Sequence, residues 1–405
     1  MIHMEASLQV LTKNYEFNLD DEPGFKGDKI FSECALNYLD SLSKVIFRDH
    51  RAKQYPDVLT FAFYCRKSNL HSLHEDYKQN RNNLLGVGLA FHIAPSNVPV
   101  NFAYSMVAGL LSGNSNIIKV PSMIFEQVEI IKDAINKISE DSNHKYISER
   151  IILVRYESTF EEYTKKFSSM CNARLIWGGD NTIDNVRKYA LQPRSREITF
   201  SDRYSLCIIN ANKFISERQI NKVTSGFYND TFLFDQNACT SPHLIIWQGT
   251  KKNIEKSQNI FWPAVHELVK EKYNLKPIQV VDKLTTFYKH AINSKNIKLQ
   301  DREDNLIWRV DIDTLSKGID NFRSNGGYFL EYKTSSFEDI FNIVSSKFQT
   351  LSYYGFSKKE LSNYIEVNRS MGIDRIVPIG KTMDFSLVWD GYDLINSLSR
   401  TIDII

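Results

Sequence analysis

LLGVGLAFHIAPSNVPVNFAYSMVAGLLSGNSNIIKV, residues 84–120, alternates between apolar runs and a helical pattern, and the fold class follows from it. Its first part, residues 84–94, is a short apolar run bounded by glycine and proline, which predicts a buried strand. Residues 98–113 are rich in small apolar side chains and close with Gly113 in a C-cap position, which predicts a helix. Residues 116–120 predict a second strand. Two strands joined by a helix of this length indicate parallel pairing.

The same alternation continues toward the carboxyl terminus. An amphipathic helix is predicted over 123–139, followed by the strand RIILVRY (150–156), a helix over 158–170 and the strand ARLIWGG (173–179). Strands that alternate with helices favour an open α/β domain, with a parallel sheet and helices on both of its faces.

A second rhythm begins at about residue 204. It predicts a strand YSLCIIN (204–210), a helix near 216–228, a strand HLIIW (243–247) and a helix over 251–273. Because a chain of 405 residues is too long for one ordinary hydrophobic core, we expect two domains.

The composition limits the class of protein but indicates no function. With 42% hydrophobic and 24% charged residues, the chain is typical of a soluble globular protein. A formal net charge of +2 argues against a nucleic-acid partner, and the apolar runs are far shorter than the ~20 residues of a membrane span. The five cysteines are widely spaced, and the start MIHMEASLQV lacks a secretory pattern. We therefore expect reduced thiols, a cytoplasmic location and no metal site.

Polar residues follow the first two predicted strands of the sheet. Asn97, in FHIAPSNVP (91–99), lies where ligands bind in open α/β sheets, and its amide could face a developing oxyanion. The alternative is that Ser96 or Asn97 only caps the next helix. Lys119, in IIKVPS, could reach a ribose hydroxyl or a phosphate, and the neutral Ser122 would not repel a 2′-phosphate. A solvated lysine at the end of a strand is the alternative.

Paired glycines follow the strand at 173–177. In LIWGGDNT (175–182), Gly178 and Gly179 would let a ligand approach the backbone, and the helix that follows suits a pyrophosphate. A tight turn with an Asp or Asn cap would use the same residues.

One cysteine stands in a polar bend. Cys239 is surrounded by FDQNACTSPH (234–243), whereas Cys65 and Cys207 lie in apolar or mixed runs. A nucleophilic cysteine needs a cation, a helix N-terminus or hydrogen-bond donors that stabilise its thiolate. The alternative is a buried structural thiol. His243 is close in sequence, but a strand that begins at this point would direct its side chain elsewhere.

Taken together and in order, these stretches resemble one family. The motifs at 88–122, at WGGD (177–180) and at FDQNACTSPH, with the final DRIVPIGKTMDFSLVWDGYDLI (374–395), are similar to the acyl-CoA reductases of the bioluminescence fatty acid reductase (LuxC) type. That family belongs to the aldehyde dehydrogenase superfamily. The resemblance implies a Rossmann-type nicotinamide-cofactor domain, 1–203 plus 373–405, with an inserted α/β catalytic domain, 204–372.

The resemblance also implies roles for individual residues at the catalytic centre. Cys239 matches the nucleophile, and Asn97 matches the asparagine that forms an oxyanion hole with the backbone amide of that cysteine. Hydrolytic members of the superfamily have a water-activating glutamate in a segment that corresponds to ITFSDRYS (198–205) here. Neither Glu197 nor Asp202 matches that position cleanly, which favours reduction of an acyl-cysteine over its hydrolysis.

Four residues match the cofactor side of the family pattern. Lys119 matches the lysine that holds the adenosine ribose or its 2′-phosphate. Ser122 stands where a glutamate often marks a preference for NAD, so its neutrality favours NADPH. Gly178 and Gly179 fall near the turn that passes the cofactor.

The function implied is the NADPH-dependent reduction of an acyl thioester to an aldehyde through an acyl-cysteine. The acyl group would come as acyl-CoA or from an acyl carrier or acyl-protein synthetase partner, and a homo-oligomer is expected. Two alternatives remain at this stage. One is an aldehyde dehydrogenase that oxidises an aldehyde to the acid, and the other is a catalytically silent subunit that binds a partner.

Overall fold

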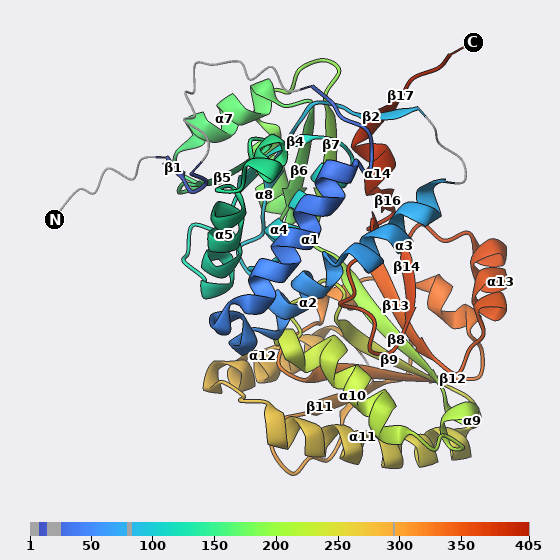
Figure 1. Cartoon of the computed structure of the whole chain (residues 1–405). Helices are drawn as coiled ribbons and strands as arrows, with labels where there is room; N and C mark the ends of the chain where they lie inside the picture. Colours follow the sequence, from blue (N-terminus) through green and yellow to red (C-terminus); the bar gives the residue numbers. More distant parts are fainter. Residues whose placement is uncertain (1–7, 14–25, 79–82, 295, 405) are drawn as a thin grey trace. The chain divides into compact units, whose positions relative to one another are not determined.

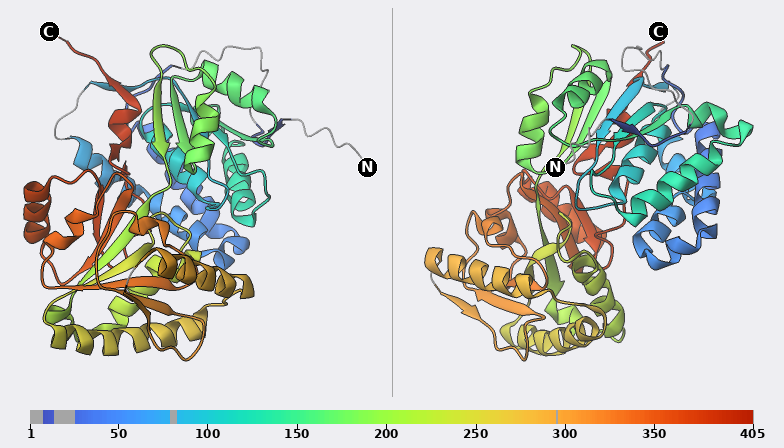
Figure 2. Two further views of the ribbon diagram at one scale, coloured as in Figure 1. Left: turned by 180° about the vertical axis from the view of Figure 1, so that it is seen from behind. Right: turned by 90° about the vertical axis from the view of Figure 1, so that its left-hand side faces the viewer.

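The computed structural model describes residues 8–13, 26–78, 83–294 and 296–404. The chain divides into two compact units, one made of Met1–Ser201 with Leu387–Ile405 and the other of Asp202–Ser386. Figure 1 and Figure 2 follow both units by colour along the sequence.

The boundaries of the units differ from the predicted domains at one end. The first boundary is close to the predicted one, but residues 373–386 belong to the second unit and not to the first. The reason is that β14 (Arg375–Pro378) pairs in parallel with β13 (Phe348–Tyr354) of the second unit's sheet.

The first unit has a six-stranded sheet in the order β1-β5-β4-β3-β6-β7, which is parallel except for β1. The predicted parallel α/β fold is therefore confirmed. The strands are β1 (Gln9–Val10), β3 (Leu89–Ile93), β4 (Ser115–Lys119), β5 (Ile151–Arg155), β6 (Ala173–Trp177) and β7 (Arg196–Phe200). The helices are α1 (Glu33–Arg48), α2 (Pro56–Tyr64), α3 (Lys67–Lys78), α4 (Asn101–Leu111), α5 (Glu126–Ile138), α6 (Lys145–Ser148), α7 (Glu161–Met170), α8 (Asp180–Arg187) and α14 (Leu394–Ser397).

Helices cover both faces of this sheet (Figure 2). Successive side chains of a strand point to opposite faces. On β3, Phe91 packs against Phe167 of α7, whereas the next residue, His92, is hydrogen-bonded to Ser105 of α4. The two helices therefore cover opposite faces.

The predicted strand over 84–94 is interrupted. Its first part, β2 (Leu84–Gly86), pairs antiparallel with β17 (Ser399–Thr401), and only β3 enters the main sheet. The break falls at Gly88, whose φ of 129° is open to glycine and strained for other residues. A further short pair consists of β15 (Val388–Trp389) and β16 (Tyr392–Asp393).

Gly113 ends α4 as predicted. It has φ 81°, and a Cβ atom there would lie 2.1 Å from the carbonyl oxygen of Asp28. The left-handed conformation and the close approach of another backbone both require glycine at this position.

The second unit has a seven-stranded sheet in the order β10-β11-β12-β9-β8-β13-β14, parallel except for β10. The remaining strands are β8 (Tyr204–Asn210), β9 (Pro242–Gln248), β10 (Ile297–Leu299), β11 (Trp308–Ile312) and β12 (Tyr328–Thr334). The helices are α9 (Ala211–Phe214), α10 (Ile220–Thr231), α11 (Lys251–Lys272), α12 (Pro277–Asn293) and α13 (Lys358–Asn368).

Both faces of this sheet are buried. Leu206 and Ile208 of β8 join one apolar cluster, and Cys207 and Ile209 join the other. A parallel strand that is covered on both faces reads as a continuous apolar run, which is why YSLCIIN was recognisable as a strand. Helices α10 and α11 cover the Cys207 face of the sheet (Figure 1). Phe227 and other aromatic side chains pack in the cluster on that face.

Candidate active site

Cys239 lies in a short loop between α10 and β9, at the amino-terminal edge of the parallel strands of the second unit, and is half-buried. The loop begins with two successive residues in the left-handed conformation, Asp235 (φ 54°) and Gln236 (φ 57°). Neither is glycine, so each costs roughly 1 kcal/mol and must be held by its surroundings.

The side-chain carboxamide of Gln236 stabilises this conformation of the loop. Its Oε1 accepts hydrogen bonds from the amides of Gly327 (2.7 Å) and Tyr328 (3.1 Å), and its Nε2 donates to the carbonyls of Pro242 (3.1 Å) and Tyr328 (3.3 Å). The side chain is buried. One amide group thus ties the loop to the start of β9 and to the start of β12.

The carbonyl of Cys239 is fixed as well. The Ser205 hydroxyl donates to it at 2.6 Å and in turn accepts from the Thr350 amide at 3.2 Å. Ser205 lies at a register shift between β8 and β9, and such irregularities are common next to active sites. The backbone at Cys239 is therefore held from two neighbouring strands.

The other cysteines do not offer a comparable thiol. Cys65, Cys171 and Cys207 are fully buried, and burial raises the pKa of Cys171 and of Cys207 to about 12. Burial also raises the pKa of Cys65. Cys34 is exposed on α1 of the first unit. Cys239 alone among the five combines partial exposure with a structured polar loop.

His243 is not placed to act as a base. It is buried on β9 and stacks on Tyr204, with ring centroids 5.7 Å apart. Burial lowers the pKa of His243 to about 3, and the nearby Arg323 lowers it further. The ring therefore stays neutral inside the sheet.

In the first unit, Asn97 lies exposed in a bend that follows β3. The alternative that Ser96 or Asn97 caps the next helix is wrong. Helix α4 begins only at Asn101, and its N-cap position is Val100, with no side-chain cap hydrogen bond. The proline-rich stretch before α4 delays the helix, and the side chain of Asn97 is left at the edge of the sheet.

Lys119 ends β4 and is partly buried. Its Nζ lies 4.8 Å from the centroid of the Tyr156 ring. Burial lowers the pKa of Lys119, and the negative charge of Glu157 opposes this. The Ser122 hydroxyl donates to the carbonyl of Tyr156 at 3.2 Å. Lys119 is thus a held, partly desolvated cation and not a freely solvated one.

Gly178 and Gly179 follow β6 and lead into α8. The N-cap of α8 is Gly179 itself, with no side-chain cap hydrogen bond, so the alternative of an Asp or Asn cap is wrong. A Cβ atom on Gly179 would meet nothing within 4 Å, whereas one on Gly178 would contact Thr182 at 3.0 Å. The backbone at Gly179 therefore borders open space, and this fits the close approach of a ligand.

The strands of the first unit bring three of these positions to one edge. β3 lies between β4 and β6, and Ile93 is the register partner of both Lys119 and Ile176. The loops with Asn97, Lys119 and Gly178 therefore leave the carboxyl ends of adjacent parallel strands. Cys239 belongs to the other unit.

Two carboxylates that were compared with a water-activating glutamate are held in ion pairs. Glu197 on β7 is paired with Arg174 and with Arg187. Burial alone would raise the pKa of Glu197, but hydrogen bonds from the two arginines keep it below its ordinary value. Asp202 accepts from Arg323 at 2.6 Å. Glu197 therefore lacks the raised pKa of a general base.

The buried carboxylate network around Glu331 in the second unit is structural. Glu331 on β12 is fully buried and is paired with Arg309 at 2.7 Å. It also accepts hydrogen bonds from the side chains of Trp247, Gln258 and Trp262. With four donors on one carboxylate, Glu331 holds α11 against the sheet.

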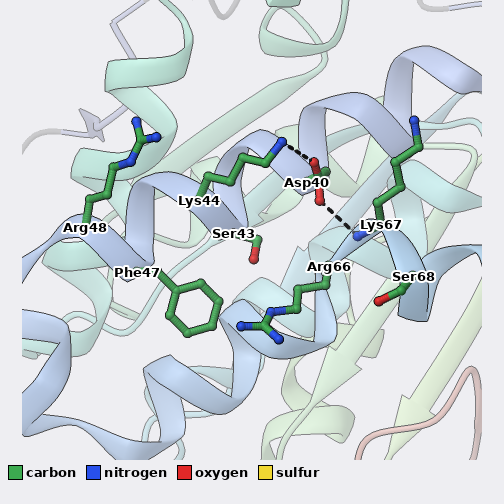
Figure 3. A pocket seen from close by; sticks show the side chains of 8 residues that line it. All are labelled: Asp40, Ser43, Lys44, Phe47, Arg48, Arg66, Lys67 and Ser68. Atoms are coloured by element: carbon green, nitrogen blue, oxygen red, sulfur yellow. Dashed lines mark hydrogen bonds and ion pairs between the residues drawn. The ribbon is translucent and has the colours of Figure 1, made fainter.

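A cavity of about 510 Å³ lies in the first unit, on α1 and the start of α3. It contains none of the candidate residues. Half of the residues that line it are basic, and Figure 3 shows Lys44 paired to Asp40 and Arg66 beside Phe47. These cations are exposed to water, and we assign no function to the cavity.

None of the helices in the described parts of the chain is long and apolar enough to cross a membrane. The same residues contain no group of three or more His, Cys, Asp or Glu side chains that could hold a metal ion.

Comparison with solved structures defines the class of protein. The fold matches a lactaldehyde dehydrogenase with a TM-score of 0.61 over 91% of this chain and 85% of that chain, at 10% identity. It matches a glyceraldehyde-3-phosphate dehydrogenase from Methanocaldococcus jannaschii, complexed with NADP, with a TM-score of 0.57 over 91% and 88%, at 13% identity. The protein has the aldehyde dehydrogenase fold, as the resemblance implied.

Within that class, the sequence pattern of the acyl-CoA reductase (LuxC) family matches residues 13–401, and the chain belongs to this family. A long-chain acyl-protein thioester reductase of Vibrio harveyi is 21% identical over 325 residues, 78% of this chain and 63% of the relative. One from Photorhabdus laumondii is 24% identical over 164 residues, 40% of this chain and 32% of the relative. The chain thus spans less than two thirds of the length of these relatives.

Sequence reasoning does not identify the residues that hold the Cys239 loop. Gln236 stands within the FDQNACTSPH motif, but the sequence assigns no role to it or to Ser205. The contacts that matter join strands far apart in the sequence, and no local pattern predicts them.

Proposed function

We propose that this protein reduces an acyl thioester to an aldehyde through an acyl-cysteine at Cys239. The observation that carries the proposal is the Cys239 loop, in which Gln236 and Ser205 hold a half-buried thiol at the edge of a parallel sheet. Membership of the acyl-CoA reductase family and the names of the relatives support the substrate class.

In the proposed reaction, Cys239 is the nucleophile and Asn97 helps to stabilise an oxyanion. The Cys239 thiolate attacks the carbonyl carbon of the thioester, the bond to the leaving sulfur breaks, and that sulfur departs as a thiolate that takes up a proton from water. The acyl-cysteine keeps the carbonyl tethered for reduction, which is an advantage of proximity. A bound nicotinamide cofactor supplies the hydride. Asn97 and the Cys239 amide are the donors proposed for the oxyanion that then forms. Collapse of the thiohemiacetal releases the aldehyde and restores the thiolate.

We infer that NADPH is the preferred cofactor. Lys119 ends β4 as a held cation, and Ser122, three residues on, is neutral and would not repel a 2′-phosphate. The open space beside Gly179 suits the approach of the cofactor's phosphates. A dehydrogenase of the same fold is known in complex with NADP.

The acyl donor belongs to the same proposal. The relatives are named for acyl-protein thioesters, so we propose a partner protein, an acyl-protein synthetase or an acyl carrier, as the source of the acyl group. Acyl-CoA is the small-molecule alternative. Parallel assays with both kinds of thioester distinguish the two donors.

Cys239→Ser tests the nucleophile. We expect this variant to lose both aldehyde formation and covalent acyl labelling, while NADPH binding stays near normal because the cofactor groups lie on other elements. Labelling is measured as a mass increase of the protein by mass spectrometry after incubation with an isotopically labelled acyl thioester.

The matched control is Cys34→Ser, which removes an exposed thiol of the first unit. It should leave labelling unchanged. Retention of the label in Cys239→Ser, together with its loss in Cys207→Ser, would move the nucleophile to Cys207 and overturn the assignment. Release of free acid from an aldehyde and NADP⁺ by the wild type would instead indicate an oxidising dehydrogenase.

A further inference from the structure

The loop that follows β14 is clamped to α10 by a buried carboxylate. Asp230 accepts hydrogen bonds from the Gly380 amide (2.6 Å), the Thr382 amide (3.0 Å) and the Thr382 hydroxyl (2.9 Å). Gly380 has φ 90°, and a Cβ atom there would lie 2.9 Å from Cα of Gly226 on α10. Residues 379–384, here named the clamp loop, thus lie directly against α10, the helix that leads to the Cys239 loop.

Arg375, the first residue of β14, holds the clamp loop from the other side. Its guanidinium donates to the carbonyls of Thr382 and Asp384, and to that of Lys381 at 3.1 Å. Carbonyl oxygens fix the orientation of the planar fork without removing its formal charge. Arg375 is therefore a positive charge held in one place.

Two contacts connect this arrangement with Cys239. The Thr240 hydroxyl, one residue after the cysteine, donates to Sδ of Met383 in the clamp loop at 3.3 Å. In the sheet, Arg375 is the register partner of Thr350, whose amide donates to Ser205, and Ser205 donates to the carbonyl of Cys239. Both routes place Arg375 and Cys239 at the same edge of the sheet.

The charges at this edge are consistent with that placement. Burial lowers the pKa of Arg375, and the negative charges of Asp384, Asp230 and the Cys239 thiolate oppose this effect. Cys239 is thus within electrostatic range of the guanidinium.

We propose that Arg375 is a positioning residue for the acyl-transfer site, whose fixed guanidinium favours the thiolate form of Cys239. The inference rests on the proposed function only in taking Cys239 as the nucleophile. A thiolate is favoured by a nearby cation, because the cation offsets the cost of removing negative charge from water.

The other titratable groups around the loop do not supply this charge. Lys381 is paired with Asp384 at 2.8 Å on the exposed side of the clamp loop. Asp230 is negative or neutral, since burial raises its pKa to about 6. His243 stays neutral, and Asp235 accepts a hydrogen bond from Tyr273 at 2.7 Å. Arg203 and Arg323 are also cations at this edge, but they are ion-paired with Asp374 and Asp202. Arg375 is the cation on which the charge of Cys239 acts.

The test compares two variants of Arg375 by the alkylation of Cys239. Arg375→Gln keeps hydrogen-bond donors and removes the charge, whereas Arg375→Lys keeps the charge and loses the fork. The rate of iodoacetamide labelling at Cys239 is measured against pH by peptide mass spectrometry, with no thioester or cofactor present. We expect the midpoint of the rate profile to stay near that of the wild type in Arg375→Lys. In Arg375→Gln it should move up by about one pH unit.

Lys381→Met is the matched control, because it removes an exposed cation, with 59% of its side chain exposed, from the same loop. It should shift the midpoint far less than Arg375→Gln, since exposed charges are screened by water and salt. A purely structural role of Arg375 would lower the melting temperature of both Arg375 variants and leave both midpoints unchanged, which would overturn the proposal.

The measurement stays decisive in two difficult cases. If Arg375→Gln does not fold, the pH profile of alkylation at Cys239 is measured for the wild type, folded and unfolded in urea. A midpoint of the folded protein that is no lower than that of the unfolded protein overturns the proposal. If Cys239→Ser keeps its acyl label, the proposed function fails, but the alkylation profiles still report whether Arg375 acts on the thiol.

Discussion

The Cys239 loop of the second unit and the carboxyl edge of the first unit's sheet, proposed here as the nucleophile and cofactor sites, are built in opposite ways. At the loop, the buried Gln236 carboxamide makes four hydrogen bonds, and Ser205 fixes the carbonyl of Cys239. At the edge, Asn97 lies exposed in a bend, and the backbone of Gly179 borders open space. The polar groups that fix the loop are hydrogen-bonded within the protein, whereas those at the edge are exposed and can bind a ligand.

The difference has a physical reason. A nucleophile must be held within a fraction of an ångström of its productive position, and the strain of two left-handed residues is tolerated only where surrounding bonds determine the backbone. Polar groups at the edge are solvated until a ligand replaces the water, so leaving them exposed costs little.

Gln236→Leu should give the largest loss. It leaves the amides of Gly327 and Tyr328 and two carbonyls buried without their partner, and each such group costs about 1–3 kcal/mol, with incomplete additivity. We expect the free energy of unfolding to fall by about 4 kcal/mol in urea titrations.

Asn237→Ala is the control for the loop, because Asn237 is exposed and is bonded to Asn325 alone of the side chains described. Its free energy of unfolding should change by less than about 0.5 kcal/mol. Equal losses in the two variants would mean that the loop does not depend on the Gln236 carboxamide.

Asn97→Ala should reduce turnover without affecting stability. If Asn97 is an oxyanion donor, its removal slows turnover by roughly 10²–10³, which corresponds to about 2.7–4 kcal/mol. Melting temperature should be unchanged because no helix cap is lost. Ser96→Ala serves as the control, and normal turnover of Asn97→Ala would remove this residue from the site.

The core beneath the cofactor edge should be sensitive to acid. His92 is buried, with Nδ1 2.7 Å from the Ser105 hydroxyl and Nε2 2.9 Å from Oδ1 of Asn116. Burial lowers the pKa of His92 to about 4, from an ordinary value of 6.5. Between these two values the unfolded chain binds a proton that the folded chain does not, so stability falls as the pH falls.

This effect should cost about 2 kcal/mol between pH 7 and pH 5. The measurement is urea unfolding of the wild type and of His92→Gln at both pH values. The variant is expected to be less stable at pH 7, but its free energy of unfolding should fall less between pH 7 and pH 5. The difference between the two proteins isolates the contribution of His92 from that of His243. Parallel pH dependence in the two proteins would contradict the prediction.

Lys119→Ala should give the smallest change. We expect NADPH to bind about tenfold more weakly, or about 1.4 kcal/mol, and NADH to be affected less, because the charge acts chiefly on the 2′-phosphate. Fluorescence titration measures both constants, with Lys137→Ala on the exposed side of α5 as the control. Equal weakening of both cofactors would mean that Lys119 contacts the ribose instead.

Local patterns predicted most of the elements because both sheets are parallel and buried. Runs such as YSLCIIN and NIIKV are apolar throughout, and Gly113 marked the end of α4. The predictions went wrong where partners were distant: residues 84–94 divide between two sheets at Gly88, and residues 373–386 join the second unit through β13. The pairing of β2 with β17 joins segments from opposite ends of the chain, which no window of the sequence contains.

The sequence by itself determined the class of fold, the family and the polar bend that contains Cys239. These depend on periodicity and on short motifs, in which the informative residues are neighbours along the chain. Only the tertiary structure decided what holds the loop of that cysteine: the carboxamide of Gln236 bonded to β12 and the hydroxyl of Ser205 on β8. Hydrogen bonds and charges act over a few ångströms in space, so their partners are chosen by folding and not by position in the sequence.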